Sequence, residues 1–198
     1  MKKMVKILLV FIGAFLLTGC DFFVIENEHV EYLKGKHYAE MKIAKYGTVE
    51  MELDADTAPI TVTNFMKLVD EGYYDGLYIH RVLKGFVIQG GEGKTRENIK
   101  GEFDANGVSN DISHVRGTIS MARAGDYSTG FDTGSTQFFI VQEDSFSLDH
   151  YYAGFGHVTK GMEVVDKIAN AVKTVDKNGM ILNDEEMPII EYIKKIEK

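Results

Sequence analysis

The chain has 198 residues, of which 44% are hydrophobic and 26% are charged. This length suits one domain plus a targeting segment, and this composition is globular, which excludes disordered and fibrous chains. The formal net charge of −8 makes nucleic acid a poor candidate partner, because phosphate contacts need clustered Lys and Arg, and the single cysteine excludes a disulfide framework.

The first predicted element is a secretion signal over residues 1–19. Its only charged residues are three lysines near the start, and an apolar run follows over residues 7–17. Such a run is short for a membrane span but suits the core of a signal peptide, so we expect the segment to direct export.

The lone cysteine directly follows this signal, in the sequence LTGC at residues 17–20. This tetrapeptide resembles a bacterial lipobox, in which signal peptidase cuts before the cysteine and the sulfur then carries a diacylglyceryl group. The resemblance implies a lipoprotein form, lipidated at Cys20 and held at the outer face of the cell membrane, because two acyl chains anchor a protein stably. The alternative is a signal anchor with an incidental cysteine.

Residues 20–36 are predicted to be the lipidated cysteine and a tether, ahead of a folded domain at residues 37–198. A flexible tether of this length reaches roughly 20–25 Å from the bilayer. The apolar stretch at residues 22–25 either lies in the lipid interface or packs on the domain.

The domain begins with a predicted β-hairpin. Met41 and Ile43 are separated by one polar residue, and the same alternation continues over residues 49–54. Alternation with a period of two is typical of half-buried strands, and residues 46–47 are expected to form the turn between them.

A helix is predicted next, beginning near Pro59 and ending at Gly72. Proline is favoured in a first helical turn, and Asp56 or Thr57 is expected to cap it. Apolar residues then recur at helical spacing, at Val62, Phe65, Met66 and Val69. The same spacing predicts a second helix around Val165, Ile168, Ala169 and Val172.

The remaining strands are predicted from short apolar runs at residues 77–83, 86–89, 118–121, 137–142 and 189–196. Many short strands with two isolated helices favour a mainly β fold. The architecture expected from this pattern is a closed antiparallel barrel whose ends are covered by the helices.

Four segments carry a more specific signal. They read YIHRVLKGFVIQGG, RGTISMARAG, GSTQFFI and LDHYYAGFG, at residues 78–91, 116–125, 134–140 and 148–156. Together and in this order they resemble the signature of cyclophilin-type peptidyl-prolyl cis-trans isomerases, over most of residues 38–198. The resemblance implies a closed eight-stranded antiparallel barrel capped by two α-helices, and an isomerase that needs no cofactor.

The chemistry of such a reaction explains why an arginine matters. Rotation about a peptide bond crosses a barrier of about 18–20 kcal/mol, because resonance must be broken. A catalyst needs an apolar socket for the proline ring and a fixed donor aimed at the amide as it twists, and the guanidinium of Arg81 suits the second role. No nucleophile or metal ion is required, and the six histidines form no metal-binding motif.

By resemblance, the catalytic residues are Arg81, His80 and Gln89. The substrate-binding residues implied in the same way are Phe86, Val87, Ala122, Arg123, Gln137, Phe139, Leu148 and Tyr152. A structural role is the alternative for His80. Because neighbouring residues of a strand face opposite ways, Phe138 and Phe139 cannot both be core, and the resemblance selects Phe139 for the pocket.

The chain departs from the family pattern in four places, one of which is Arg123, where the family often has asparagine. It has no tryptophan, and Ser147 stands where many members carry one on the pocket rim. The loop at residues 126–133 is longer than in short members, and the sequence assigns no role to an insert at residues 173–187.

The sequence therefore predicts a monomeric, lipid-anchored peptidyl-prolyl cis-trans isomerase. Its expected partners are X–Pro segments of secreted or envelope proteins, whose folding it would assist at the outer face of the cytoplasmic membrane. The alternative is a non-catalytic chaperone or adaptor that grips proline-containing segments. Retention of Arg81, Phe86 and Gln89 together favours the enzyme, because a gripping module needs only the apolar socket.

Overall fold

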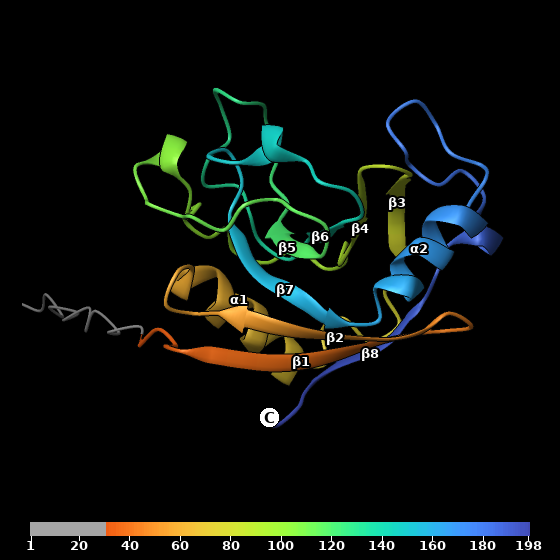
Figure 1. Cartoon of the computed structure of the whole chain (residues 1–198), viewed down its shortest axis with the longest axis horizontal. Coiled ribbons are helices and arrows are strands. Elements are labelled where there is room, and N and C mark those ends of the chain that lie inside the picture. Colours follow the sequence, from red (N-terminus) through yellow and green to blue (C-terminus); the bar gives the residue numbers. More distant parts are fainter. Residues whose placement is uncertain (1–30) are drawn as a thin grey trace, which may run out of the picture. The chain divides into compact units, whose positions relative to one another are not determined.

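Eight β-strands and two α-helices make up residues 31–198, the part of the chain that the computed structural model describes (Figure 1). The predicted signal peptide, Cys20 and residues 21–30 of the predicted tether lie outside the described residues. Among the helices of residues 31–198, none is both long and apolar enough to cross a bilayer.

The first two strands form the predicted hairpin. β1 (Lys36–Ile43) pairs antiparallel with β2 (Gly47–Asp54), and alternate residues of both strands are buried. The turn between them uses left-handed backbone at Lys45, with φ of 66°, and at Gly47, with φ of 136°. The alternating pattern was therefore a reliable guide to both the strands and their buried face.

Helix α1 (Pro59–Asp70) confirms the predicted helix but not its cap. The N-cap residue is Ala58, whose methyl group accepts no hydrogen bond, so the expected capping by Asp56 or Thr57 is wrong. The buried carboxylate of Glu102 replaces them, accepting two backbone N–H groups of the first turn at 2.9 and 2.7 Å. A carboxylate at this end is favoured because helix N-termini carry partial positive charge.

The other strands are β3 (Ile79–Leu83), β4 (Val87–Gly90), β5 (Thr118–Met121), β6 (Phe138–Val141), β7 (Gly154–Lys160) and β8 (Ile190–Lys195). All eight strands belong to one antiparallel sheet with the order β3-β4-β6-β5-β7-β2-β1-β8. The mainly β, eight-stranded prediction is therefore confirmed.

Complete closure of the barrel is not confirmed. β3 and β8 stand at the two ends of the strand order and are not paired with each other, and the residues just before them meet at the isolated bridge between Tyr78 and Ile189. Beyond that bridge, residues 179–181 occupy the edge of β3, through hydrogen bonds of 2.8 Å to the N–H of Val82 and 2.9 Å to the carbonyl of His80. The sheet is curled but open, because this segment takes the edge that β8 would need.

β7 is the strand that the alternation pattern did not predict. Gly154 and Gly156 interrupt its apolar sequence. A Cβ atom at Gly156 would lie 2.5 Å from the carbonyl oxygen of Glu52 on β2. Glycine is needed there because two backbones approach closely, and this requirement hides the strand from a pattern search.

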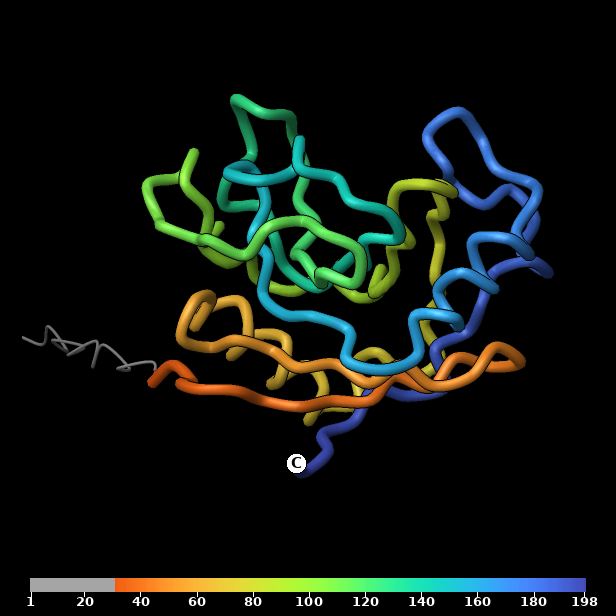
Figure 2. The backbone as a smooth tube through the Cα atoms, viewed as in Figure 1, coloured from red at the N-terminus to blue at the C-terminus, as the bar shows by residue number. Residues whose placement is uncertain are grey.

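The helices cover the sheet near opposite ends of the β1–β2 hairpin (Figure 1). α1 contacts β2 and β8, whereas α2 (Met162–Ala171) contacts β2 and β3. Their apolar faces are buried in the main core, and the helical spacing predicted for α2 is confirmed. Figure 2 shows the long connections of residues 91–137 gathered beside the sheet, away from β1.

A second, smaller apolar cluster lies on the other face of β4 and β6. It comprises Val87, Phe139, Val141 and Leu148, with Phe86, Ala122 and Tyr152 packed against it. The intervening residues of the same strands, including Phe138, belong to the main core. Phe138 and Phe139 therefore face opposite ways, as predicted, and the smaller cluster forms a second apolar surface outside the core.

Candidate functional site

Arg81 lies on β3 with its guanidinium held by two partners. Its Nη1 donates to Oε1 of Gln89 at 2.9 Å, and its Nε donates to the carbonyl oxygen of Asn178 at 2.8 Å. Half-burial lowers the pKa of Arg81, partly offset by Tyr152 and Asp176, and arginine still remains charged at neutral pH. The result is a fixed cation whose orientation is set from two sides.

Gln89, on the neighbouring strand β4, is the link between Arg81 and the rest of the site. Its Nε2 donates to Oε1 of Gln137 at 2.9 Å, while its own Oε1 accepts from Arg81. β3 and β4 pair directly at Arg81 and Gln89, so the sheet register itself places the two side chains together. The chain of hydrogen bonds gives each glutamine a defined amide orientation.

A cavity of about 240 Å³ opens beside this cation. It is lined by Arg81, Phe86, Val87, Gln89, Ala122, Arg123, Tyr127, Phe139, Leu148 and Tyr152. Nine of these ten residues were predicted as site residues, and the structure brings them together. Tyr127 was missed, because no local pattern links a tyrosine in a long polar loop to a pocket built on other strands.

A second cavity, of about 290 Å³, adjoins the first. It shares Gln89, Ala122 and Arg123 with the first cavity and is also lined by Gln137. The predicted substrate-binding residue Gln137 is therefore placed one cavity away from the apolar socket. A chain that enters the socket can continue along this more polar groove.

His80 is the predicted site residue that lies outside both cavities. Its side chain is buried, and burial lowers the pKa of the imidazole against the raising effect of Glu92, whose carboxylate lies 3.8 Å from Nε2. Within residues 31–198, Nδ1 has no hydrogen-bond partner. His80 is therefore buried outside the two cavities, and its catalytic role stays a prediction.

The floor of the first cavity rests on a buried polar group. His114 stacks on Phe139, with ring centroids 6.0 Å apart, and its two nitrogens lie 2.8 Å from Asp149 Oδ1 and 2.9 Å from Ser120 Oγ. Burial lowers the pKa of His114, opposed by Asp149. Ser120 is fully buried, so this serine, histidine and aspartate arrangement supports the pocket and cannot serve as a hydrolytic triad.

The insert at residues 173–187 lies along the edge of β3, and we call it the β3-edge hairpin. Oδ1 of Asp176 accepts the N–H groups of Asn178 and Met180, both at 2.8 Å, which shapes the turn. This turn presents the Asn178 carbonyl to Arg81. An Asn-Gly turn signal was visible in the sequence, but its pairing partner lies almost one hundred residues earlier in the chain.

The base of the β3-edge hairpin is closed by Glu186. Its carboxylate accepts the N–H groups of Lys173 and Thr174 at 2.8 and 3.1 Å, and the hydroxyl of Thr174 at 2.8 Å. These donors lower the pKa of Glu186 to about 2, so the carboxylate stays ionised at neutral pH. The hairpin that holds Arg81 is thus itself fixed at both ends.

Within the described residues, no group of three or more His, Cys, Asp or Glu side chains is arranged to hold a metal ion. The site consists of a cation, amide groups and an apolar socket. Such a set can bind an apolar ring and donate hydrogen bonds to an adjacent amide. It does not offer an exposed, activated nucleophile, which matches the chemical requirement for rotating a bond without breaking one.

Comparison with known proteins gives a consistent family assignment. A profile described as cyclophilin type peptidyl-prolyl cis-trans isomerase/CLD matches residues 38–191. Peptidyl-prolyl cis-trans isomerase A of Dickeya dadantii is 41% identical over 164 residues, covering 77% of this chain and 80% of the relative. Peptidyl-prolyl cis-trans isomerase B of Bacillus subtilis is 43% identical over 128 residues, covering 62% and 83%.

Solved structures agree with the sequence comparisons. The crystal structure of a Cryptosporidium parvum cyclophilin type peptidyl-prolyl cis-trans isomerase superposes with a TM-score of 0.70 at 26% identity, covering 83% of this chain and 99% of that one. A crystal structure of the same protein in the presence of the dipeptide Ala-Pro gives 0.68 at 27% identity, covering 81% and 99%. The chain belongs to the cyclophilin-type peptidyl-prolyl cis-trans isomerase family.

Proposed function

We propose that the protein accelerates the isomerisation of X–Pro bonds with Arg81 as its electrostatic catalyst. The observation that carries this proposal is the double tethering of the guanidinium, by Gln89 and by the Asn178 carbonyl, beside an apolar cavity. Nη2 of Arg81 has no hydrogen-bond partner within residues 31–198. The N–H groups of Nη2 and the second N–H of Nη1 are the donors left over for a substrate.

The proposed mechanism follows from the electronic structure of the amide. The proline ring enters the apolar cavity, against Phe86, Phe139 and Leu148. As the X–Pro bond twists, resonance is lost and the proline nitrogen becomes a better acceptor. A donor fixed in advance stabilises this twisted state more than either planar end state, so the barrier falls.

Gln89, Gln137, Ala122 and Arg123 are proposed to position the rest of the peptide. Gln89 and Gln137 hydrogen-bond to each other, and both line the second cavity. A peptide bound along this groove can exchange hydrogen bonds with these amide groups, because each retains unused donor or acceptor capacity. This arrangement supports extended X–Pro segments as the substrate class.

The proposed location is the outer face of the cytoplasmic membrane. Cys20 is the proposed lipid anchor, and the domain that follows it is proposed to be a monomer. The LTGC sequence after an apolar run supports this proposal. A tether ending near β1 would keep the domain within roughly 25 Å of the bilayer. The proposed clients are secreted or envelope proteins that emerge there and whose X–Pro bonds isomerise slowly.

The test of catalysis uses a client protein whose slow refolding phase is limited by proline isomerisation. Full-length protein is expected to accelerate that phase in proportion to its concentration, and an Arg81→Lys variant to lose most of the effect, because an ammonium lacks the fixed planar geometry. An equal acceleration by both proteins would show that the guanidinium is not the catalyst.

The test of location compares cells that express the wild type with cells that express Cys20→Ser. Labelled palmitate should enter only the wild-type protein, and protease added outside spheroplasts should digest its domain. Labelling that persists in Cys20→Ser, or a protected wild-type domain, would contradict the proposed anchor or its side of the membrane.

A further inference from the structure

The connection between β5 and β6 contributes one aromatic side chain to the first cavity, beside Ala122 and Arg123. We call residues 124–133 the pocket loop. Tyr127, in this loop, lines the same cavity as Arg81 and Phe86, although its side chain is 53% exposed. Its ring packs edge-on against Tyr151, with centroids 4.7 Å apart and planes at 70°. An exposed aromatic ring at a cavity mouth is a surface that a ligand can cover.

The pocket loop has a defined internal shape. The carboxylate of Asp126 accepts the N–H and the hydroxyl of Ser128, both at 2.8 Å. Gly125 and Gly130 adopt φ of 99° and 69°, and a Cβ atom at Gly130 would lie 2.0 Å from the Ala124 carbonyl oxygen. The loop therefore crosses itself tightly, which limits where the side chain of residue 127 can lie.

Arg123 connects this loop to Tyr151, which precedes the cavity residue Tyr152. Its Nη1 donates to the carbonyl oxygen of Thr129 at 2.8 Å, and its Nε donates to that of Tyr151 at 3.0 Å. One guanidinium thus bridges the pocket loop and the segment that carries the stacking partner of Tyr127. The two tyrosines are held together by this bridge as well as by their own contact.

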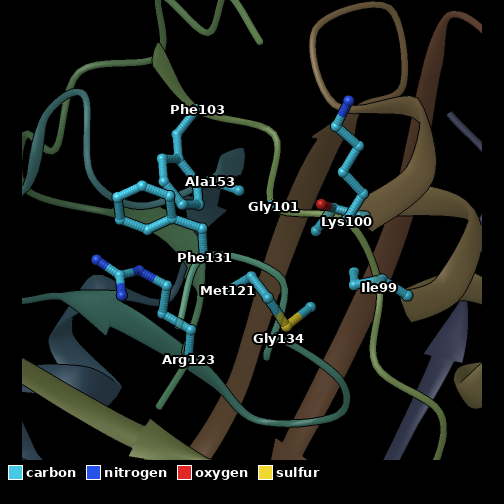
Figure 3. A pocket seen from close by; sticks show the side chains of 10 residues that line it. Ile99, Lys100, Gly101, Phe103, Met121, Arg123, Phe131, Gly134 and Ala153 are labelled. Atoms are coloured by element: carbon cyan, nitrogen blue, oxygen red, sulfur yellow. The ribbon is translucent and has the colours of Figure 1, made fainter. Parts of the chain in front are cut away.

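The surroundings of Arg123 suit a guanidinium in particular. Its central carbon lies 4.7 Å from the ring centre of Tyr152, 5.3 Å from that of Phe103 and 5.4 Å from that of Phe131. Figure 3 shows the guanidinium lying beside the Phe131 ring at the edge of a hollow of about 10 Å³. Among the described residues, Arg123 has no carboxylate partner within 4 Å, so cation–π contacts and hydrogen bonds to two carbonyl groups hold it in place.

We propose that Tyr127 is a specificity-determining residue of this isomerase, and that Arg123 is the positioning residue that holds it at the cavity. The ring of Tyr127 contacts the side chain of a residue that flanks the substrate proline. The favoured substrates are X–Pro segments with an aromatic or bulky apolar flanking residue, because such a side chain gains an aromatic contact that alanine cannot make. This inference rests on the isomerase activity proposed above.

The first experiment measures kcat/KM of the full-length protein by NMR exchange on two peptide pairs. One pair places Phe or Ala before proline, and the other places Phe or Ala after it. Wild type is expected to prefer Phe at one of the two positions. Tyr127→Ala should reduce the Phe-to-Ala ratio of kcat/KM roughly three- to tenfold, which corresponds to the interaction energy of one aromatic pair. Tyr127→Phe keeps the ring and should keep the preference.

The matched control is Tyr78→Ala, which removes a tyrosine of similar exposure outside the cavity. It should leave the Phe-to-Ala ratio at its wild-type value. Ratios that stay unchanged in Tyr127→Ala at both positions would overturn the inference while leaving the isomerase itself intact. A wild-type protein without catalysis on any of the four peptides would instead overturn the proposed function.

The second experiment tests the positioning role through Arg123→Lys, which keeps the charge but cannot bridge two carbonyl groups in one plane. We expect the same loss of preference as in Tyr127→Ala, and no further loss in the double variant, because both changes remove one interaction. Thermal unfolding identifies any loss of fold. An equal fall of kcat/KM on all four peptides, with the ratio preserved, would show that Arg123 does not act through Tyr127 and would overturn its positioning role.

Discussion

Along strands β4 and β6 the side chains alternate between two faces of the sheet, and the two faces have different roles. On one face, Phe138 is 1% exposed and packs in the main core, where its ring meets Phe65 edge-on. On the other face, Phe139 is 4% exposed and forms the floor of the first cavity with Leu148 and Tyr152. Of these two adjacent residues, Phe138 thus contributes to the stability of the fold, and Phe139 forms part of the site.

The difference lies in what each face packs against. The core face meets α1 and other strands, so its partners are regular elements. The site face meets loops and a short 3₁₀ turn at Phe146–Leu148, and it leaves a cavity uncovered. Changes on the core face should therefore reduce the free energy of unfolding, whereas changes on the site face should reduce turnover.

The largest expected effect tests this contrast directly. Phe138→Ala should lower the free energy of unfolding by about 3–5 kcal/mol, because it leaves a cavity in a packed core. Phe139→Ala should cost less stability, since water can enter the open cavity, but should lower kcat/KM of the folded protein more than Phe138→Ala does. Urea unfolding and peptide exchange rates measure the two effects. Equal losses of stability in the two variants would contradict the separation of the faces.

The next effect concerns the hydrogen bond between Gln89 and Arg81. Gln89→Leu should lower kcat about tenfold, because a hydrogen bond to a charged group is worth about 1.5 kcal/mol or more. Gln142→Leu is the matched control, since Gln142 is a buried glutamine with two hydrogen bonds that lies outside both cavities. Similar losses of kcat in both variants would show that the effect is not specific to Arg81.

A smaller effect is expected from the β3-edge hairpin. Asp176→Ala removes the acceptor that shapes the turn around Asn178, and the Nε contact of Arg81 should loosen. We expect kcat to fall about threefold with KM little changed, the rate equivalent of one net hydrogen bond. Asp56→Ala removes an exposed aspartate that also accepts a backbone N–H, and it should not change kcat. A change confined to KM would contradict a positioning role for the hairpin.

The smallest effect expected is a dependence of stability on pH. His114 faces Asp149, Ser120 and the Phe139 ring, and its burial lowers its pKa from 6.5. Below about pH 6.5 the unfolded chain binds a proton that the folded protein binds less readily, so stability falls as the pH falls. His114→Gln should reduce this slope in urea unfolding between neutral and mildly acidic pH. An unchanged slope would assign the effect to other groups, such as His80.

The sequence predicted those features that depend on local pattern. Alternation placed Phe138 and Phe139 on opposite faces, and the strand register then brought Arg81 beside Gln89. The features it missed depend on contacts between distant segments. Glu102 caps α1 from more than forty residues away, and a close approach of backbones demands Gly156.

The site shows the same division. Most of the residues that the resemblance implied lie on or beside β3, β4, β5 and β6, whereas Leu148 and Tyr152 lie on the connection between β6 and β7. Tyr127 and the Asn178 carbonyl come from connections whose position depends on Arg123 and Asp176 rather than on any repeating pattern. The parts of the site that the sequence did not place are therefore the two connections for which it offered neither a repeating pattern nor a family motif, the pocket loop and the β3-edge hairpin.

The most direct test of the account is the exchange rate of an Ala-Pro-Phe peptide, measured by NMR exchange spectroscopy with wild type, Arg81→Ala and Arg116→Ala. Arg116 is paired with Asp166 outside both cavities. Arg116→Ala therefore removes the same charge as Arg81→Ala without changing the lining of either cavity. We predict fast exchange with wild type and Arg116→Ala, and a fall of about 10²–10³ with Arg81→Ala, the typical cost of one transition-state donor. Peptide binding without faster exchange in the wild-type protein would contradict the account and leave a proline-binding chaperone or adaptor.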